Sequence, residues 1–311
     1  MKKFLFLGIA ATAMFASCTH DELVEMNPQS AIGFETFIDK STRAAADVTT
    51  DELTAFEVYG WRTKDETTQQ IFDAQAVTAD HGTCTYSPLQ YWVGSYKYAF
   101  EAVAPKSGEK GVTVDDSYGA STITFVSNSE TDLIYASASK DLSGSAHGTL
   151  ASDPGAVGLT FGHLLSRVKF TFINGAVATS AAKIAVTNVQ ITNAGTTGVY
   201  TPSTGTWAAA TANGAVTFAS TAINDITGGA YEATEHKYLI PYNVNGYKVR
   251  FTVTMTQGSV SDSFDYEVTL PNTTLVKGNS YNFKATFNPG QPIVFTAEVT
   301  PWNTFTEVTI P

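Results

Sequence analysis

The chain has 311 residues, of which 43% are hydrophobic and only 15% charged, with 18 Lys and Arg against 29 Asp and Glu. The formal net charge of -11 argues against nucleic-acid binding, which needs a basic surface that releases counterions from phosphates. Two cysteines exclude a disulfide framework and a cysteine-rich metal site, while abundant Thr, 14 Tyr and 19 Phe favour β-strands.

The first 17 residues have the proportions of a secretory signal. Lys2 and Lys3 make the start positive, and Phe4–Phe15 is an apolar run too short to span a bilayer. Small residues directly precede Cys18, as in a bacterial lipobox, although a Phe stands where Leu is usual. We therefore predict a lipoprotein signal peptide over 1–17 and lipidation at Cys18, with an ordinary signal peptide as the alternative.

Residues 18–43 are predicted to form a lipidated tether, a strand and a linker. After a polar stretch, apolar and polar residues alternate over 32–38, which is typical of a single strand. The following segment, 40–47, has no apolar periodicity and contains the Arg43-Ala44 bond. We interpret it as a linker in front of the first domain.

Beyond the linker, short alternating runs recur with turn signals between them. In the first half they lie at 56–61, 96–102, 123–125, 133–135 and 168–172. In the second half, 247–256 and 264–270 predict a hairpin around Gly258, and further strands are expected at 281–287 and 293–299. Turns are expected at Asn174-Gly175, Asn213-Gly214 and Asn245-Gly246, because Asn and Gly tolerate positive φ.

This spacing of strands, with no long helical stripe, predicts an all-β protein made of β-sandwiches. A boundary near residue 175 would divide the chain into similar domains, 44–175 and 176–311. Cys84 is the only thiol left after lipidation, and we interpret it as a buried structural residue rather than a reactive one.

Motifs for catalysis or cofactor binding are absent from the sequence, and no cofactor is expected. His163 could be a ligand or base, but a hydrogen-bonded structural histidine at a strand start is the simpler reading. The pairs Asp51-Glu52 and Asp115-Asp116 are expected to be surface acids rather than a Ca²⁺ or acid–base site. The four tryptophans could stack on sugars, yet packing in the core or at an interface is favoured, for Trp61, Trp92, Trp207 and Trp302.

Several segments together resemble the fimbrillin family, the subunits of lipoprotein-derived pili of Bacteroides and relatives, most closely its Mfa-like branch. They are Gln90–Phe100, Asp132–Ala136, Leu159–Phe170, Tyr238–Pro241, Lys277–Phe283 and Val299–Trp302. Asp21 and Glu22, just after Cys18, resemble the acidic surface-export signal of lipoproteins from the same group. The resemblance implies two tandem transthyretin-like (Greek-key) β-sandwich domains and no enzymatic activity.

The resemblance also implies a role for the linker, because an arginine- or lysine-directed protease cuts polymerising fimbrillins between an N-terminal strand and the first domain. Arg43-Ala44 matches that position. A sandwich that loses a strand exposes a groove, which a strand from a neighbouring subunit can fill by β-augmentation. Residues 293–310 are the candidate donor strand, and repetition of this contact gives a filament.

The expected partners are therefore other pilus subunits, an Arg-specific maturation protease, outer-membrane lipid through Cys18 before cleavage, and a host or bacterial receptor. The expected location is the cell surface, first as an outer-membrane lipoprotein and then as a fimbrium that serves adhesion. The alternative is a permanently lipid-anchored surface protein, either a pilus anchor or tip or a glycan-binding module.

Overall fold

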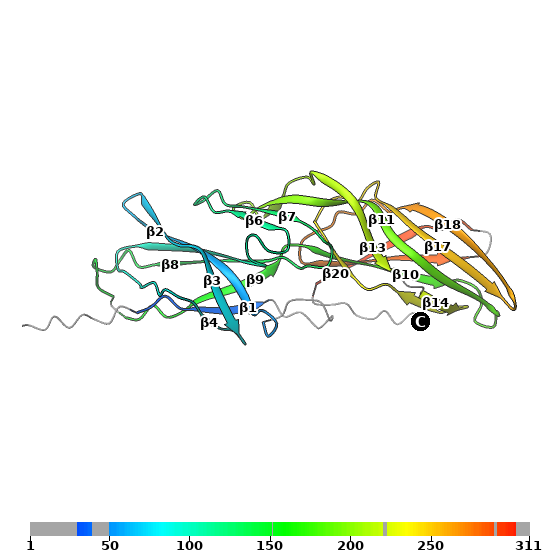
Figure 1. Cartoon of the computed structure of the whole chain (residues 1–311), viewed down its shortest axis with the longest axis horizontal. Coiled ribbons are helices and arrows are strands. Elements are labelled where there is room, and N and C mark those ends of the chain that lie inside the picture. The colour runs from blue at the N-terminus through cyan, green and yellow to red at the C-terminus, as the bar shows by residue number, and fades with distance from the viewer. Residues whose placement is uncertain (1–29, 39–49, 151, 220–222, 289–290, 303–311) are drawn as a thin grey trace, which may run out of the picture.

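The computed structural model of the chain describes residues 30–38, 50–150, 152–219, 223–288 and 291–302. Over these ranges the chain forms twenty β-strands and no helix, so none that could cross a membrane. The prediction of an all-β protein is confirmed. Figure 1 shows an elongated molecule, with β1 and its neighbours toward one end and the β17–β18 pair toward the other.

The first sheet is closed, because its first and last strands pair with each other. Its core is built by alternate side chains such as Phe56, Val58, Phe72 and Phe100, all at most 2% exposed. In spatial order its strands are β1 (Phe34–Ile38), β4 (Thr83–Thr85), β3 (Thr67–Asp80), β2 (Ala55–Lys64), β5 (Lys97–Ala104), β8 (Ile134–Asp141) and β9 (Val157–His163).

The second sheet is organised around β11 (Ala182–Thr201), a strand of twenty residues. Its order is β18 (Val260–Thr269), β17 (Lys248–Gln257), β11, β7 (Thr122–Val126) and β6 (Val112–Asp115). Three more strands also pair with β11, namely β12 (Thr206–Trp207), β13 (Ala212–Ala219) and β14 (Ile223–Thr227).

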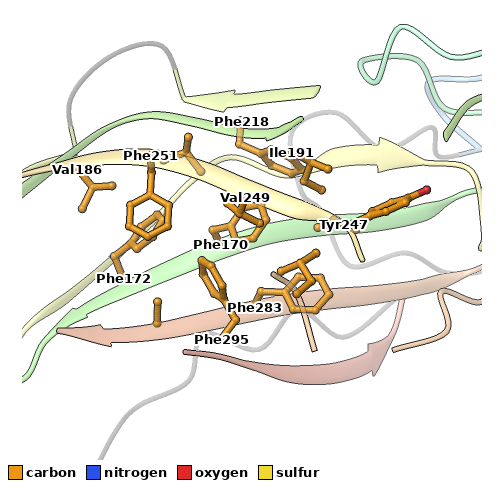
Figure 2. Packing of buried hydrophobic residues seen from close by; sticks show 14 of the residues in the cluster. Phe170, Phe172, Val186, Ile191, Phe218, Tyr247, Val249, Phe251, Phe283 and Phe295 are labelled. Carbon is orange, nitrogen blue, oxygen red and sulfur yellow. The ribbon is translucent and has the colours of Figure 1, made fainter. Parts of the chain in front are cut away.

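A third sheet packs against the second. Its order is β15 (Tyr231–Ala233), β10 (Ser166–Asn174), β19 (Asn279–Phe287) and β20 (Phe295–Pro301), with β16 (Lys237–Leu239) also paired to β10. Figure 2 shows aromatic residues of this sheet, Phe170, Phe172 and Phe283, meeting Val249 and Phe251 of β17. The phenyl rings of Phe172 and Phe251 have centroids 5.4 Å apart. Burial of these faces against each other is the main stabilising term of this end of the molecule.

The predicted hairpin around Gly258 is present and longer than expected. β17 and β18 pair over ten residues each, from Lys248 opposite Thr269 to Gln257 opposite Val260. Gly258 has a φ of 62°, which a glycine adopts without strain. Asn245-Gly246 lies in a turn as expected, whereas Asn213-Gly214 lies inside β13 and was wrongly predicted as a turn.

The two halves of the sequence are interleaved. β6 and β7 come from the first half but join the second sheet, where Thr197–Tyr200 of β11 pair with Ile123–Val126. The strand partners change between His163, which ends β9, and Ser166, which begins β10 and pairs with Leu239. β10 precedes the predicted boundary at 175 and pairs with β19 beyond it, so the division into 44–175 and 176–311 stays a prediction.

Candidate functional site: the β1 seat and the Trp302 clamp

β1 completes the closed sheet by lying between β9 and β4. It pairs in parallel with β9 along its whole length, from Phe34 opposite Val157 to Ile38 opposite Phe161. It is antiparallel to β4 at Glu35 opposite Thr83. Among the described strands, residues 157–161 of β9 pair with β1 alone, since β8 pairs only with Gly162 and His163. Loss of β1 would therefore leave residues 157–161 of β9 without their main-chain partners, which is unfavourable where water has poor access.

The alternation predicted for 32–38 is the one observed. Ile32, Phe34, Thr36 and Ile38 point inward and are at most 7% exposed, whereas Phe37 on the other face is 53% exposed. The Phe34 ring is the centre of an aromatic cluster, because its centroid lies 5.4–5.8 Å from those of three neighbours, Phe72, Tyr86 and Phe100. Without β1, the three remaining rings of Phe72, Tyr86 and Phe100 would form the floor of an apolar groove.

Main-chain hydrogen bonds hold the ends of the β1 segment. At its start, Ile32 N donates to Gln90 O at 2.8 Å, and Trp92 N donates to Ser30 O at 3.0 Å. The Tyr86 hydroxyl donates to Ile32 O at 2.6 Å. At its end, Ile38 N donates to Thr50 Oγ1 at 3.0 Å. We call β9 residues 157–161, β4, residues 86–92, Phe72 and Phe100 the β1 seat.

Cys84 lies on β4, within this seat. Its side chain is half-buried against the core, and its Sγ lies 3.8 Å from Gly82 O, the carbonyl that also accepts a hydrogen bond from Thr36 N of β1. Burial raises the pKa of the Cys84 thiol, which makes it a poor nucleophile in this state. The structural role predicted for Cys84 agrees with this environment.

The C-terminal part of the described chain ends in a buried tryptophan. The Trp302 indole stacks on the His163 imidazole at 4.3 Å between centroids and on the Tyr238 ring at 5.6 Å. The Arg167 guanidinium lies 4.8 Å from the Trp302 ring and donates to Trp302 O. His163 Nδ1 is 2.7 Å from Asp132 Oδ2, and both side chains are almost completely buried. We call these five residues the Trp302 clamp.

The clamp fixes β20, which begins the predicted donor segment. β20 pairs antiparallel with β19 from Phe295 opposite Ala285 to Pro301 opposite Asn279. Phe295 is 6% exposed and packs in the core shown in Figure 2. The first part of the predicted donor, 293–310, is thus seated in the sheet of its own chain, and residues 303–310 lie outside the described residues.

The sites predicted from the N-terminal sequence also lie outside the described residues. These are the lipidation site Cys18, the export signal Asp21 and Glu22, and the cleavage site Arg43-Ala44. The structure places the residues on either side of the linker, because β1 ends at Ile38 and the next described residue is Thr50.

The other residues considered as ligands, bases or sugar-stacking groups are packed or hydrogen-bonded within the protein. His163 is hydrogen-bonded as expected, although at the end of a strand rather than its start. Three tryptophans are at most 4% exposed (Trp61, Trp92 and Trp302), and the half-buried Trp207 donates Nε1–H to Leu164 O at 2.8 Å. Asp115 accepts from Ser117 Oγ at 2.9 Å, and within the described ranges no three His, Cys, Asp or Glu side chains converge as a metal site.

Sequence reasoning did not single out Arg167 or Asp132. Both are at most 4% exposed, which is unusual for charged residues unless they are hydrogen-bonded. One feature of the sequence could have pointed to them. Asp132, Arg167 and Trp302 each lie in a different one of the segments that carry the family resemblance. The structure brings these three segments into one cluster.

The fold of this chain is similar to that of a protein of known structure. The crystal structure of a candidate cell adhesion protein from Bacteroides ovatus matches with a TM-score of 0.54 at 15% identity, covering 88% of this chain and 98% of that one. A second candidate cell adhesion protein, from Bacteroides uniformis, matches with a TM-score of 0.45 at 18% identity, over 88% and 99% of the chains.

Residues 42–302 match the model of the fimbrillin-like family, so the chain belongs to that family. A curated relative, the fimbrium subunit Fim1C of Phocaeicola vulgatus, is 25% identical over 90% of this chain and 91% of its own. The predicted family is confirmed. The matched region begins beside the predicted cleavage site and ends at Trp302, so it excludes β1 and includes the whole clamp.

Proposed function

We propose that this chain is a structural subunit of a lipoprotein-derived surface pilus, assembled by strand exchange after proteolysis at Arg43-Ala44. Membership of the fimbrillin-like family supports a structural rather than an enzymatic role. The observation that carries the strand-exchange step is the β1 seat. One short strand with buried alternate side chains closes a sheet and is followed by the segment that contains the proposed cleavage site.

Cleavage would change the competition for the seat. While β1 is tethered, it rebinds at the high effective concentration of an intramolecular strand. After cleavage, β1 is held only by its own contacts and can be replaced by a strand whose effective concentration is higher. An incoming strand must restore the pairing with β9 and fill the cluster around Phe34.

Within the predicted donor segment 293–310, we assign the donor role to residues 303–310. β20 is fully paired with β19, and Trp302 is held by stacking and by Arg167. Withdrawing β20 would expose Phe295 and open the core of its own subunit. The clamp therefore supports a donor that begins after Trp302 and leaves β20 in place.

The arginine positions make a protease experiment selective. The other three arginines, Arg62, Arg167 and Arg250, lie in β2, β10 and β17, where strand pairing resists proteolysis. An Arg-specific protease acting on the lipid-free chain from Thr19 onward should release residues 19–43. It should then give filaments or an SDS-sensitive ladder.

The matched control is Arg43→Ala, which should stay uncut and monomeric under the same treatment. Clean cleavage after Arg43 with a strictly monomeric product would contradict a shaft role. Resistance of the Arg43-Ala44 bond to the protease would instead favour the alternative of a permanently anchored surface protein. The glycan-binding form of that alternative has less support, since the three most buried tryptophans are packed in the protein interior.

A further inference from the structure

β18 is a free edge of the second sheet with few of the devices that usually protect an edge strand. It pairs with β17 over ten consecutive residues without a bulge, while no described strand pairs with its other side. It contains no Pro, Lys or Arg, and its charged residues are Asp262, Asp265 and Glu267. Such a strand offers a row of unpaired main-chain groups to another polypeptide. The edge strands β6 and β20 are shorter, with four and seven residues.

The inward face of β18 runs past the core of its own subunit. Tyr266 stacks on Phe251 at 5.6 Å between centroids and is partly buried. The next residues on the same face are open, because Phe264 is 48% and Val260 is 63% exposed, and Met255 of β17 beside them is 41% exposed. Figure 1 shows β18 at the rim of the molecule. These side chains leave apolar surface exposed on this face, on which Asp262 is the one charged residue of β18.

The sequence of β18 is complementary to itself when two copies run antiparallel about Phe264. In that register Phe264 faces Phe264 of the second copy, Val260 faces Val268, and Asp262 faces Tyr266, whose phenol can donate to a carboxylate. On the outward face, Ser261 lies opposite Glu267 and Ser263 opposite Asp265. No like charges are directly opposed.

The two acids on the outward face of β18, Asp265 and Glu267, are hydrogen-bonded or ion-paired within one chain. Glu267 accepts from Lys248 Nζ at 2.8 Å and from Arg250 Nη2 at 3.1 Å. Asp265 accepts from Thr252 Oγ1 at 2.6 Å. The two Asp265 carboxylates of a pair would lie on a diagonal, each already hydrogen-bonded to its own subunit. The outward face therefore opposes pairing only weakly.

We propose that β18 is a lateral interaction surface whose partner is β18 of a second copy of this chain, with Phe264 on the twofold axis. The contact joins two copies of the second sheet into one continuous sheet through main-chain hydrogen bonds. It does not involve the β1 seat and is independent of proteolysis. Between filaments, it would produce lateral association.

Single cysteines test the register in the lipid-free chain with Cys84→Ser. Phe264→Cys should give a disulfide-linked dimer on mild oxidation, because directly opposed strand residues lie within disulfide reach. The matched control is Ser261→Cys, which faces Glu267 and should not crosslink to itself. Equal crosslinking of the two variants, or none by Phe264→Cys at millimolar protein, would overturn the proposal.

Opposed charges provide the second test, by sedimentation of uncrosslinked protein. Phe264→Lys and Phe264→Glu should each weaken dimerisation by about tenfold or more, because like charges then face each other. An equimolar mixture of the two should restore the dimer. A dimer that persists in either single variant, or a mixture that stays monomeric, would show that β18 does not pair in this way.

Discussion

The His163 imidazole and the Trp302 indole lie face to face, with ring centroids 4.3 Å apart and planes inclined by 13°. His163 ends β9, whose first five residues hold β1, and Trp302 directly follows β20. One stacked pair therefore connects β9, which forms part of the β1 seat, to the segment that precedes the proposed donor. The pair thus joins the last described residue to the middle of the chain, through side chains that no local pattern relates.

Trp302→Ala should lower the free energy of unfolding by about 3–5 kcal/mol, since it removes a large buried side chain that contacts His163, Tyr238 and Arg167. Urea unfolding of the lipid-free chain measures the change. Tyr242→Ala is the control, because Tyr242 is 42% exposed and its loss should cost about 1 kcal/mol or less. Equal effects of the two substitutions would contradict the clamp.

The two phenylalanines of β1 provide a matched pair within one strand. Phe34→Ala should destabilise the uncleaved chain by about 3–5 kcal/mol, because the ring packs among Phe72, Tyr86 and Phe100. Phe37→Ala should cost about 1 kcal/mol or less, because that side chain is 53% exposed. Thermal or urea unfolding would show a reversed order if β1 were seated in the other register.

Gly60 on β2 should resist even the smallest enlargement. An added Cβ would lie 2.7 Å from Phe72 Cδ2 and 3.1 Å from Phe100 Cδ1, two rings of the seat. We expect Gly60→Ala to cost about 1–3 kcal/mol from overpacking. Gly144→Ala is the control, since nothing lies within 4 Å of its added Cβ, and its stability should change by less than about 0.5 kcal/mol.

Cys84 reports on the occupancy of the seat. In the chain from Thr19 it is the only thiol, and burial holds its pKa above the ordinary range. Alkylation should therefore be slow at neutral pH and accelerate only at alkaline pH. After the β1 segment is removed by cleavage and washing in mild denaturant, the apparent pKa should fall and the rate at neutral pH should rise. An unchanged pH profile would mean that β1 does not cover this thiol.

Acid should lower the stability of the folded chain through His236. Burial, followed by the charge of Arg167, lowers the pKa of His236 to about 4 from 6.5. The unfolded chain therefore binds a proton that the folded chain does not, so stability is lost as the pH falls from about 6.5 toward 4. His236→Gln should reduce this slope, as measured by urea unfolding across that range. An identical slope in the variant would exclude His236 as the source.

Local alternation was sufficient for strands that keep one face buried throughout. β1 and β17 are examples, because Phe34, Thr36 and Ile38, and likewise Val249, Phe251 and Val253, alternate without interruption. Hydrophobic period then gives both the strand and its buried face. The hairpin of β17 and β18 was predictable for the same reason, with Gly258 as the turn.

Strand β11 was not predicted from the sequence, because register shifts interrupt its pairing with the neighbouring strands. Its buried residues change parity along the strand, from Ile184 and Val186 to Val189 and Ile191, and then to Ala194. Register shifts occur at these steps, and Asn188 has a φ of 56°. Each bulge moves the inward face by one residue, so a search for period two finds only fragments. The longest of the described strands therefore could not be recognised from its hydrophobic pattern.

The clamp could not be derived from sequence for a different reason. Its five residues come from segments separated by up to 170 positions, and nothing in a single sequence pairs Asp132 with His163 or Arg167 with Trp302. Arg43 is the reverse case, because the sequence points to it while the described residues do not include it. The sequence places it in a linker, and the matched family region begins beside it. Whether the bond after Arg43 is cut is determined from the N-terminus of the mature protein.

N-terminal sequencing of the protein purified from the surface of its own cells tests strand exchange most directly. Assembled material that begins at Ala44 is the expected result, because the seat can accept a neighbouring strand only after β1 has left. Assembled material that begins at lipidated Cys18 and keeps residues 19–43 would contradict the account and identify the chain as a permanently anchored protein.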